Sequence, residues 1–182
     1  LAESVYRGIE APVIRTEIKS AEMIKYASNA FLATKISFAN ELGNLCKALR
    51  IDAYEVMKGV GMDHRINPHF LNAGAGFGGS CFPKDLSALI ALAQSLDEKP
   101  LILRSVQEVN ERQPLRLLEL LEGKIGRLKG KRIAVLGLAF KNDTDDIRES
   151  RSIPVIMKLK EEGADIVAYD PKAADSMKRL IQ

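Results

Sequence analysis

The chain has 182 residues, of which 46% are hydrophobic and 28% are charged, enough to bury a core in one large domain or two small ones. Its formal net charge of +3 with well-mixed charges argues against a nucleic-acid surface, and no apolar run approaches the roughly 20 residues of a membrane span. Two cysteines and two histidines, without a CxxC pair, predict no metal site and no disulfide framework, and they fit a reducing, cytoplasmic location.

A long helix is predicted from Ser20, acting as its cap, to Leu49. Apolar or small residues recur along it in steps of three or four, the spacing of one helix face. They are Ile24, Ala27, Phe31, Thr34, Phe38, Leu42, Leu45 and Leu49. The other side is also apolar, at Leu32, Ile36, Ala39 and Cys46. We therefore expect burial on two sides, one of them against a partner chain, and hence a homodimer through this helix. Cys46 fits this pattern as a core residue.

Helices also account for the rest of the first region. Residues 1–10 predict the tail of a helix that begins earlier in a longer protein. A short helix is predicted at 52–58, then a loop at 59–75 that is long enough to be functional or flexible. Two further helical patterns follow, at residues 85–96 and 101–121. We assign residues 1–122 to an all-helical central domain that carries the dimer contact.

The pattern changes at Gly130 from helices to strands. An apolar, β-branched run at 131–140 precedes a polar loop, a helix at 153–162 and a second strand at 165–171. This order predicts a βαβ unit, in which Phe140 and Lys141 stand at the carboxyl end of the first strand, where ligands bind. The turn after that strand, GLAFKND, lacks the GxGxxG fingerprint. Residues 123–182 are thus predicted to be the first part of a Rossmann-like, doubly wound domain, and the fold class is α + α/β.

The most informative segment is GFGGSCFPKD, from Gly76 to Asp85. It places Cys81 in a glycine-rich turn that opens a helix, with Pro83 suited to the first helical turn. The positive end of the helix dipole and the neighbouring Lys84 favour a reactive thiolate, and backbone N–H groups of the turn can hold an oxyanion. The alternative from the residues alone is a buried structural thiol in a tight turn.

Lys25 and Asn29, four residues apart, project from one face of the long helix and could bracket a single oxyanion. The competing interpretation is a solvated lysine beside a mid-helix asparagine. Asp85 lies in the first turn of its helix, where it could stabilise the helix dipole or activate a water molecule. Four basic residues fall in predicted loops and could pair with phosphate or carboxylate, or be surface charges. These are Arg65, Lys141, Arg148 and Arg151.

Four motifs in this order resemble the UDP-glucose 6-dehydrogenase family within the UDP-glucose/GDP-mannose dehydrogenases. They are KYASNAFLATKISFANE from Lys25, GMDHRI from Gly61, GFGGSCFPKD from Gly76 and GLAFKNDTDDIRES from Gly137. The resemblance covers almost the whole chain. It implies an NAD-dependent, two-step oxidation of the C6 alcohol of UDP-glucose to a carboxylate, without nucleic-acid or membrane partners.

The resemblance also implies roles for individual residues. Cys81 matches the nucleophile that carries a thiohemiacetal and then a thioester, Lys25 and Asn29 match the pair that stabilises oxyanions, and Asp85 matches a carboxylate associated with the catalytic water. Arg65 resembles an arginine that reaches a neighbouring subunit's sugar site, and Arg148 one that touches NAD. The implied substrate contacts are Phe70, Leu71, Asn72, Gly74, Gly76, Phe77 and Gly78 in one loop, with Phe140 and Lys141. Some relatives carry a lysine at the place of Asn72.

Two other interpretations stay open at this point. A GDP-mannose dehydrogenase or a dehydrogenase of an N-acetylated UDP-sugar would share the cysteine turn, although Phe82 and the wording SCFPKD favour UDP-glucose. From another class, the chain could be a dimerisation and nucleotide-sugar-binding module. The family's NAD-binding domain would precede Leu1, so the chain by itself is expected to be folded and dimeric but catalytically silent.

Overall fold

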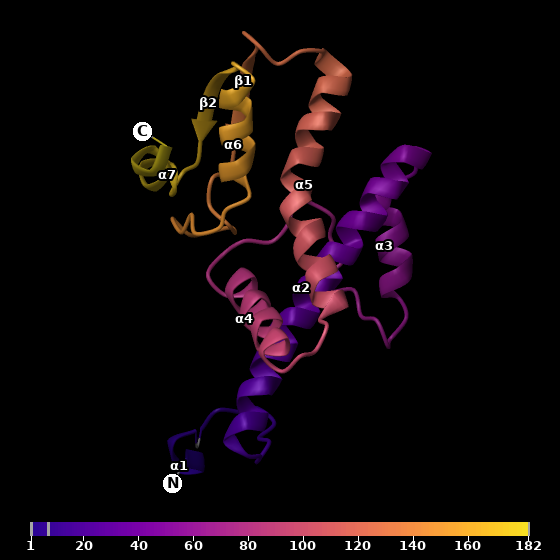
Figure 1. Cartoon of the computed structure of the whole chain (residues 1–182), viewed down its shortest axis with the longest axis vertical. Coiled ribbons are helices and arrows are strands. Elements are labelled where there is room, and N and C mark those ends of the chain that lie inside the picture. The colour runs from indigo at the N-terminus through magenta and orange to yellow at the C-terminus, as the bar shows by residue number, and fades with distance from the viewer. Residues whose placement is uncertain (1, 7, 182) are drawn as a thin grey trace.

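The computed structural model describes residues 2–6 and 8–181. A helical part leads through one long helix into a small βαβ unit (Figure 1). In chain order the elements are α1 (Ala2–Val5), α2 (Ile18–Leu49), α3 (Ala53–Gly61), α4 (Phe82–Ser95), α5 (Leu101–Ile125), β1 (Arg132–Leu136), α6 (Ser152–Glu161), β2 (Asp165–Tyr169) and α7 (Ala174–Ile181).

The long helix α2 begins before its predicted cap. Glu17 is the N-cap, with an extended backbone and no side-chain cap bond, and the Ala21 N–H donates to the Glu17 carbonyl over 2.9 Å. Ser20 therefore already lies inside the helix, and its prediction as cap was wrong. At the other end Arg50 adopts a left-handed conformation (φ 59°), and its N–H reaches the carbonyls of Cys46 and Lys47.

The predicted helical tail at residues 1–10 is helical in α1 alone. Leu1 and Arg7 lie outside the described residues. From residue 8 to the start of α2 the described chain forms no helix or strand.

Small side chains make the buried face of α2. Ala30, Ala33, Ala39 and Gly43 are buried there, and α4 and α5 pack closely against the helix. Cys46 is also buried, as predicted.

The larger apolar residues of the predicted stripe on α2 face solvent in the single chain. Ile24, Phe31, Phe38 and Leu45, spaced seven residues apart, are 48–65% exposed. The chain itself therefore leaves this side of α2 uncovered. Its burial against a second chain stays a prediction.

The remaining helices differ from prediction mainly at their ends. α3 starts after Asp52, whose carboxylate accepts the Tyr54 N–H over 2.8 Å, and it runs on to Gly61. α4 begins at Phe82 with a proline in its first turn, as the motif predicted. α5 continues to Ile125, beyond both the predicted helix end and the proposed domain boundary at residue 122. That boundary stays a prediction.

The βαβ unit is present as predicted. β1 and β2 pair in parallel, with Ala134 opposite Val167, and α6 forms the crossover. α5 joins this unit to the helical part because Leu118 packs with Leu128 and Leu159 in one buried cluster. The loop between β1 and α6 is thereby brought toward the start of α4. Whether these strands belong to a complete Rossmann-like sheet stays a prediction.

Within the part of the chain that the structure describes, no helix combines the length and apolarity needed to cross a membrane.

Replacing Leu159 by alanine tests the junction between α5 and the βαβ unit. Leu159 is 1% exposed, so its truncation leaves a cavity and should lower the free energy of unfolding by about 2–5 kcal/mol. Urea denaturation measures this change. Met157→Ala, on the same helix at a 45% exposed position, is the control and should change stability by about 1 kcal/mol or less. Equal effects of the two substitutions would contradict the described packing.

Candidate active site

Cys81 is the N-cap residue of α4, and its side chain is exposed. Its carbonyl accepts the Asp85 N–H over 2.9 Å, the first hydrogen bond of the helix. The hydroxyl of Ser80 lies 3.7 Å from the sulfur. The thiol thus stands at the positive end of the α4 dipole, where the sequence placed it.

Lys25 and Asn29 come together with Asp85 beneath this turn. The amide of Asn29 donates to Oδ2 of Asp85 over 2.6 Å, and the Lys25 ammonium contacts the same oxygen. The pair on α2 therefore lies on one face, and in this structure it brackets an oxygen of Asp85. Its binding of a reaction oxyanion stays a prediction. Lys84 contacts the other Asp85 oxygen, Oδ1, over 2.6 Å.

The Asp85 side chain is fully buried, while both lysines remain half-exposed or more. Burial raises the pKa of Asp85, but hydrogen bonds from Lys25, Lys84 and Asn29 together outweigh it and lower the pKa to about 2. The carboxylate is therefore ionised at neutral pH and is a weak proton acceptor. In this arrangement its main effect is to hold the two lysines and the amide in place.

Lys84 was expected to act on Cys81, and the structure gives it a different principal partner. Its pKa is raised chiefly by its hydrogen bond with Asp85, with a smaller electrostatic contribution from Cys81. The ammonium groups of Lys84 and Lys25 lie 5.7 and 5.2 Å from the ring centre of Tyr26. One carboxylate and one aromatic ring thus bring two cations together at the first turn of α4.

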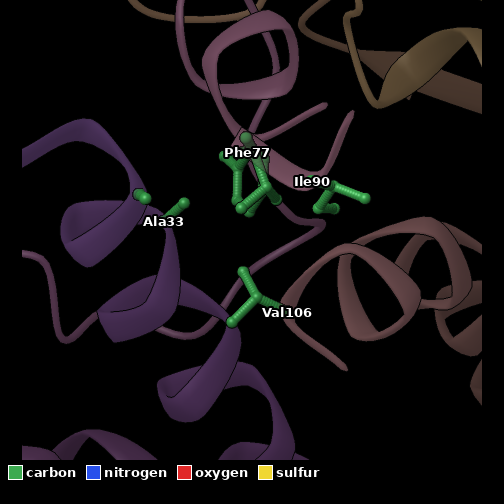
Figure 2. Close-up of a cluster of buried hydrophobic side chains, with 6 residues drawn as sticks. Ala33, Phe77, Ile90 and Val106 are labelled. Atoms are coloured by element: carbon green, nitrogen blue, oxygen red, sulfur yellow. The ribbon is translucent and has the colours of Figure 1, made fainter. Parts of the chain in front are cut away.

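The predicted substrate loop precedes Cys81, and part of it faces the protein interior. Leu71 packs in a buried cluster with Ala39 and Met57, and Phe77 packs in another with Ala33 and Val106 (Figure 2). These two side chains serve packing in the structure. Phe77 also lines the cavity described below.

Phe82 connects the ends of the same loop. Its ring centre lies 6.2 Å from that of Phe70 and 6.0 Å from that of Phe77, the latter in an edge-to-face arrangement. The backbone of Phe70 is left-handed, with φ 64°. The Asn72 side chain is exposed.

The glycines of the cysteine turn allow the βαβ unit to approach. A Cβ atom on Gly79 would lie 2.5 Å from the Phe140 ring, and one on Gly78 would lie 2.1 Å from the Glu149 carbonyl oxygen. The Gly79 N–H donates to the Arg148 carbonyl over 2.9 Å. Phe140, which the sequence placed at a site mouth, therefore lies directly against the cysteine turn, with Lys141 above its ring at 5.5 Å.

A cavity of about 500 Å³ lies at this junction, within the range typical of small-molecule sites. Its walls come from the cysteine turn, α4, α5 and the loop before α6. Lys84, Arg148 and Arg151 give it basic groups, and Glu111 and Glu149 give it acidic ones.

Arg148 and Arg65 each bond to the aspartate two residues earlier in the chain. In each case the aspartate two residues earlier accepts the arginine's backbone N–H over 2.9 Å and also its guanidinium. The bond from Arg148 lowers the pKa of Asp146 to about 2. Whereas Arg148 lines the cavity, no described residue lining it comes from the loop that carries Arg65.

Sequence reasoning missed a set of buried amide side chains that hold the substrate loop. Asn40 on α2 and both Asn110 and Gln113 on α5 bond to the backbone of Gly74 or Phe77. Their signal in the sequence was polar amides three or four residues apart among apolar helix positions, similar to the pair at Lys25 and Asn29.

The loop also contains GAGFGG at residues 74–79, which matches the letters GxGxxG. No strand of the described chain precedes it, so it lacks the strand–turn–helix setting of a dinucleotide site.

Comparisons with known proteins agree with this geometry. The family model for the central domain of the UDP-glucose/GDP-mannose dehydrogenase family matches residues 19–112, and the model for its UDP binding domain matches residues 134–182. The chain belongs to this family. It is 52% identical over 177 residues to UDP-glucose 6-dehydrogenase AglM of Haloferax volcanii, a match that covers 97% of the chain and 41% of that relative.

Solved structures of the family are similar over nearly the whole chain. A UDP-glucose dehydrogenase from Pyrobaculum islandicum superimposes with a TM-score of 0.95 at 46% identity, covering 99% of the chain and 42% of that protein. A UDP-D-ManNAc dehydrogenase from Pyrococcus horikoshii gives 0.83 at 31% identity, covering 99% and 44%. The chain thus spans about 40% of the length of these relatives.

The acid sensitivity of the protein tests the carboxylate cluster. Because folding lowers the pKa of Asp85 from 3.8 to about 2, its ion pairs stabilise the protein fully above about pH 4, and their contribution is lost as the pH falls toward 2. Asp85→Asn should be less stable than wild type by about 2 kcal/mol at neutral pH, and this difference should shrink between about pH 4 and pH 2.

Urea denaturation across that pH range measures the difference. Glu98→Gln, at an exposed position, is the control and should show no such pH-dependent gap. A gap for Asp85→Asn that stays constant down to pH 2 would count against the described ion pairs.

Proposed function

We propose that the full-length protein oxidises UDP-glucose to UDP-glucuronate with NAD in two steps, through covalent intermediates on Cys81. The observation that carries this proposal is an exposed thiol at the N-terminus of α4, one helical turn before Asp85, whose charged oxygen a lysine and an amide of α2 bracket. The family of the chain supports the substrate class.

Each residue of the cluster has a chemical task in this proposal. The sulfur of Cys81 attacks the C6 aldehyde left by the first oxidation and holds it as a thiohemiacetal, which prevents its escape. The second oxidation converts this to a thioester, and water then releases the carboxylate and restores the thiol. Lys25 and Asn29 stabilise the oxyanion at each stage. Asp85 keeps them aligned and helps to place the hydrolytic water.

The cavity supports a role in binding the nucleotide-sugar. Its basic groups suit a diphosphate, and Phe77 of the substrate loop lines it. By family resemblance we also assign substrate contacts to the rest of the loop from Phe70 to Gly78 and to Phe140 and Lys141, none of which lines this cavity.

NAD, when bound, accepts the electron pair of each oxidation. Arg148, exposed at the cavity, fits one of its phosphates, whereas the turn after β1 lacks the GxGxxG fingerprint. The nicotinamide is therefore expected to be held by a part of the full-length protein outside these 182 residues. The chain on its own should form no NADH, and its two free cysteines suit the cytoplasm.

A homodimer through α2 is part of the proposal. Ile24, Phe31, Phe38 and Leu45 are exposed at seven-residue intervals along α2, an apolar stripe that a second copy would cover. Arg65, which does not reach its own chain's cavity, would then contact the partner's sugar site.

A second candidate substrate is an N-acetylated UDP-sugar, because the similar structure from Pyrococcus horikoshii is a UDP-D-ManNAc dehydrogenase. GDP-mannose is a further alternative within the family. Outside the enzyme class, a dimerisation and nucleotide-sugar-binding module would keep the cavity without needing the cluster around Asp85.

Counting NADH per sugar tests the reaction. The full-length protein given limiting UDP-glucose should form two NADH per sugar, and Cys81→Ala should lose this activity because the aldehyde is no longer held. Cys46→Ala, a change in the core, is the control and should retain the yield of two. One NADH per sugar would mean that the reaction stops at the aldehyde, and none would point to another nucleotide-sugar or to a binding module.

The dimer is tested by Phe38→Glu in the full-length protein. The substitution places a charge in the proposed interface, so light scattering after gel filtration should show a lower mass. Leu180→Glu, at a 55% exposed position on α7, is the control and should leave the mass unchanged. An unchanged mass for Phe38→Glu would exclude α2 as the interface.

A further inference from the structure

We infer that Asn110 and Gln113 on α5, with Asn40 on α2, are positioning residues that set the place of the cysteine turn for the reaction. The inference rests on the proposed function for its catalytic consequence, while its structural part can be tested separately.

The backbone of Gly74 and Phe77 forms its hydrogen bonds with side chains. In most segments a helix or sheet would supply these bonds. The Gly74 N–H donates to Oδ1 of Asn40 over 2.6 Å, and its carbonyl accepts from Gln113 over 2.9 Å. Asn110 accepts the Phe77 N–H over 2.7 Å and donates to the Phe77 carbonyl over 3.0 Å. Both backbone groups of two residues are therefore satisfied by amides from two helices.

The three amides are buried, each at most 4% exposed, and Gln113 is in addition bonded across the helices to α2. Asn44, one turn after Asn40 on α2, donates to Oε1 of Gln113 over 2.9 Å. Because this bond occupies Oε1 of Gln113, its Nε2 faces the Gly74 carbonyl and donates to it.

The close contact between the loop and Asn110 requires a glycine at position 76. Gly76 has φ +106°, and a Cβ atom there would lie 2.6 Å from Oδ1 of Asn110. On its other side the turn rests against Phe140 and the Glu149 backbone through Gly78 and Gly79. A segment fixed from both sides ends two residues before Cys81.

Two atoms of the network are unpaired. Among the described residues, Nδ2 of Asn40 and Oδ1 of Asn44 are buried without a hydrogen-bond partner. Each such group costs about 1–3 kcal/mol. An apolar side chain in place of Asn40 or Asn44 would remove the unpaired group but would leave the Gly74 N–H or Oε1 of Gln113 without its partner. A requirement for loop position accounts for retaining polar amides here.

The helix that grips the loop also carries the oxyanion pair. Asn29 and Asn40 are about three turns apart on nearly the same side of α2. Because α2 is one continuous helix, it fixes the position of the loop before Cys81 relative to Lys25 and Asn29. A displacement of about 1 Å between reacting groups can reduce the rate by about 100-fold.

The test compares Asn110→Ala and Gln113→Met with Ser37→Ala in the full-length protein. Ser37→Ala removes another buried bond between α2 and α5, from the Ser37 hydroxyl to the Val106 carbonyl at 3.0 Å, without touching the loop. All three should lose some stability. Hydrogen exchange of residues 71–80, read by mass spectrometry, should accelerate in Asn110→Ala and Gln113→Met and stay at the wild-type rate in Ser37→Ala.

The kinetic readout is kcat/KM for UDP-glucose, which should fall about 10-fold or more in the two loop variants and stay within about threefold of wild type in the control. Wild-type exchange rates in both loop variants, or kcat/KM values equal to that of Ser37→Ala, would overturn the inference. If the wild-type protein oxidises no nucleotide-sugar, the proposed function fails, and the exchange rates still decide whether the amides hold the loop.

Discussion

The buried carboxylate of Asp85 is the interaction on which the site depends. A charge taken out of water is costly unless it is paired, and this one is paired by two ammonium groups and an amide from two helices. Because Lys25 and Asn29 belong to α2 whereas Asp85 and Cys81 belong to the start of α4, the ion pairs fix one helix against the other. The same contacts that stabilise this packing hold Lys25 and Asn29 at the first turn of α4, the turn that Cys81 caps.

A second constraint is the narrow space between the cysteine turn and the βαβ unit. The Phe140 ring and the Glu149 carbonyl come so close to Gly78 and Gly79 that no side chain fits there. Since the βαβ unit is anchored through α5, as the cluster around Leu159 shows, the position of the turn depends on both parts of the chain. The cavity at their junction is a consequence of this arrangement, and its basic residues come from both sides.

Local patterns were sufficient to predict the elements and the cysteine turn, because helix periodicity, a proline at a helix start and a β-branched run each report on neighbouring residues. They were also sufficient to place Lys25 and Asn29 on one face. They did not reveal that Lys84 pairs with Asp85, or that Asn110 and Gln113 hold a loop more than 30 residues away in sequence, because those contacts depend on tertiary packing. For α2, periodicity located the apolar positions. It could not tell which of them the chain itself buries and which it leaves exposed.

The proposed function depends on a covalent intermediate at Cys81. Rapid acid quenching of the full-length protein with UDP-glucose and NAD, followed by mass spectrometry of its cysteine peptides, would detect it. We expect a nucleotide-sugar adduct on the peptide that contains Cys81 and none on the peptide that contains Cys46. Turnover of the sugar with no adduct on Cys81 at any quench time, or with the adduct on another residue, would contradict it.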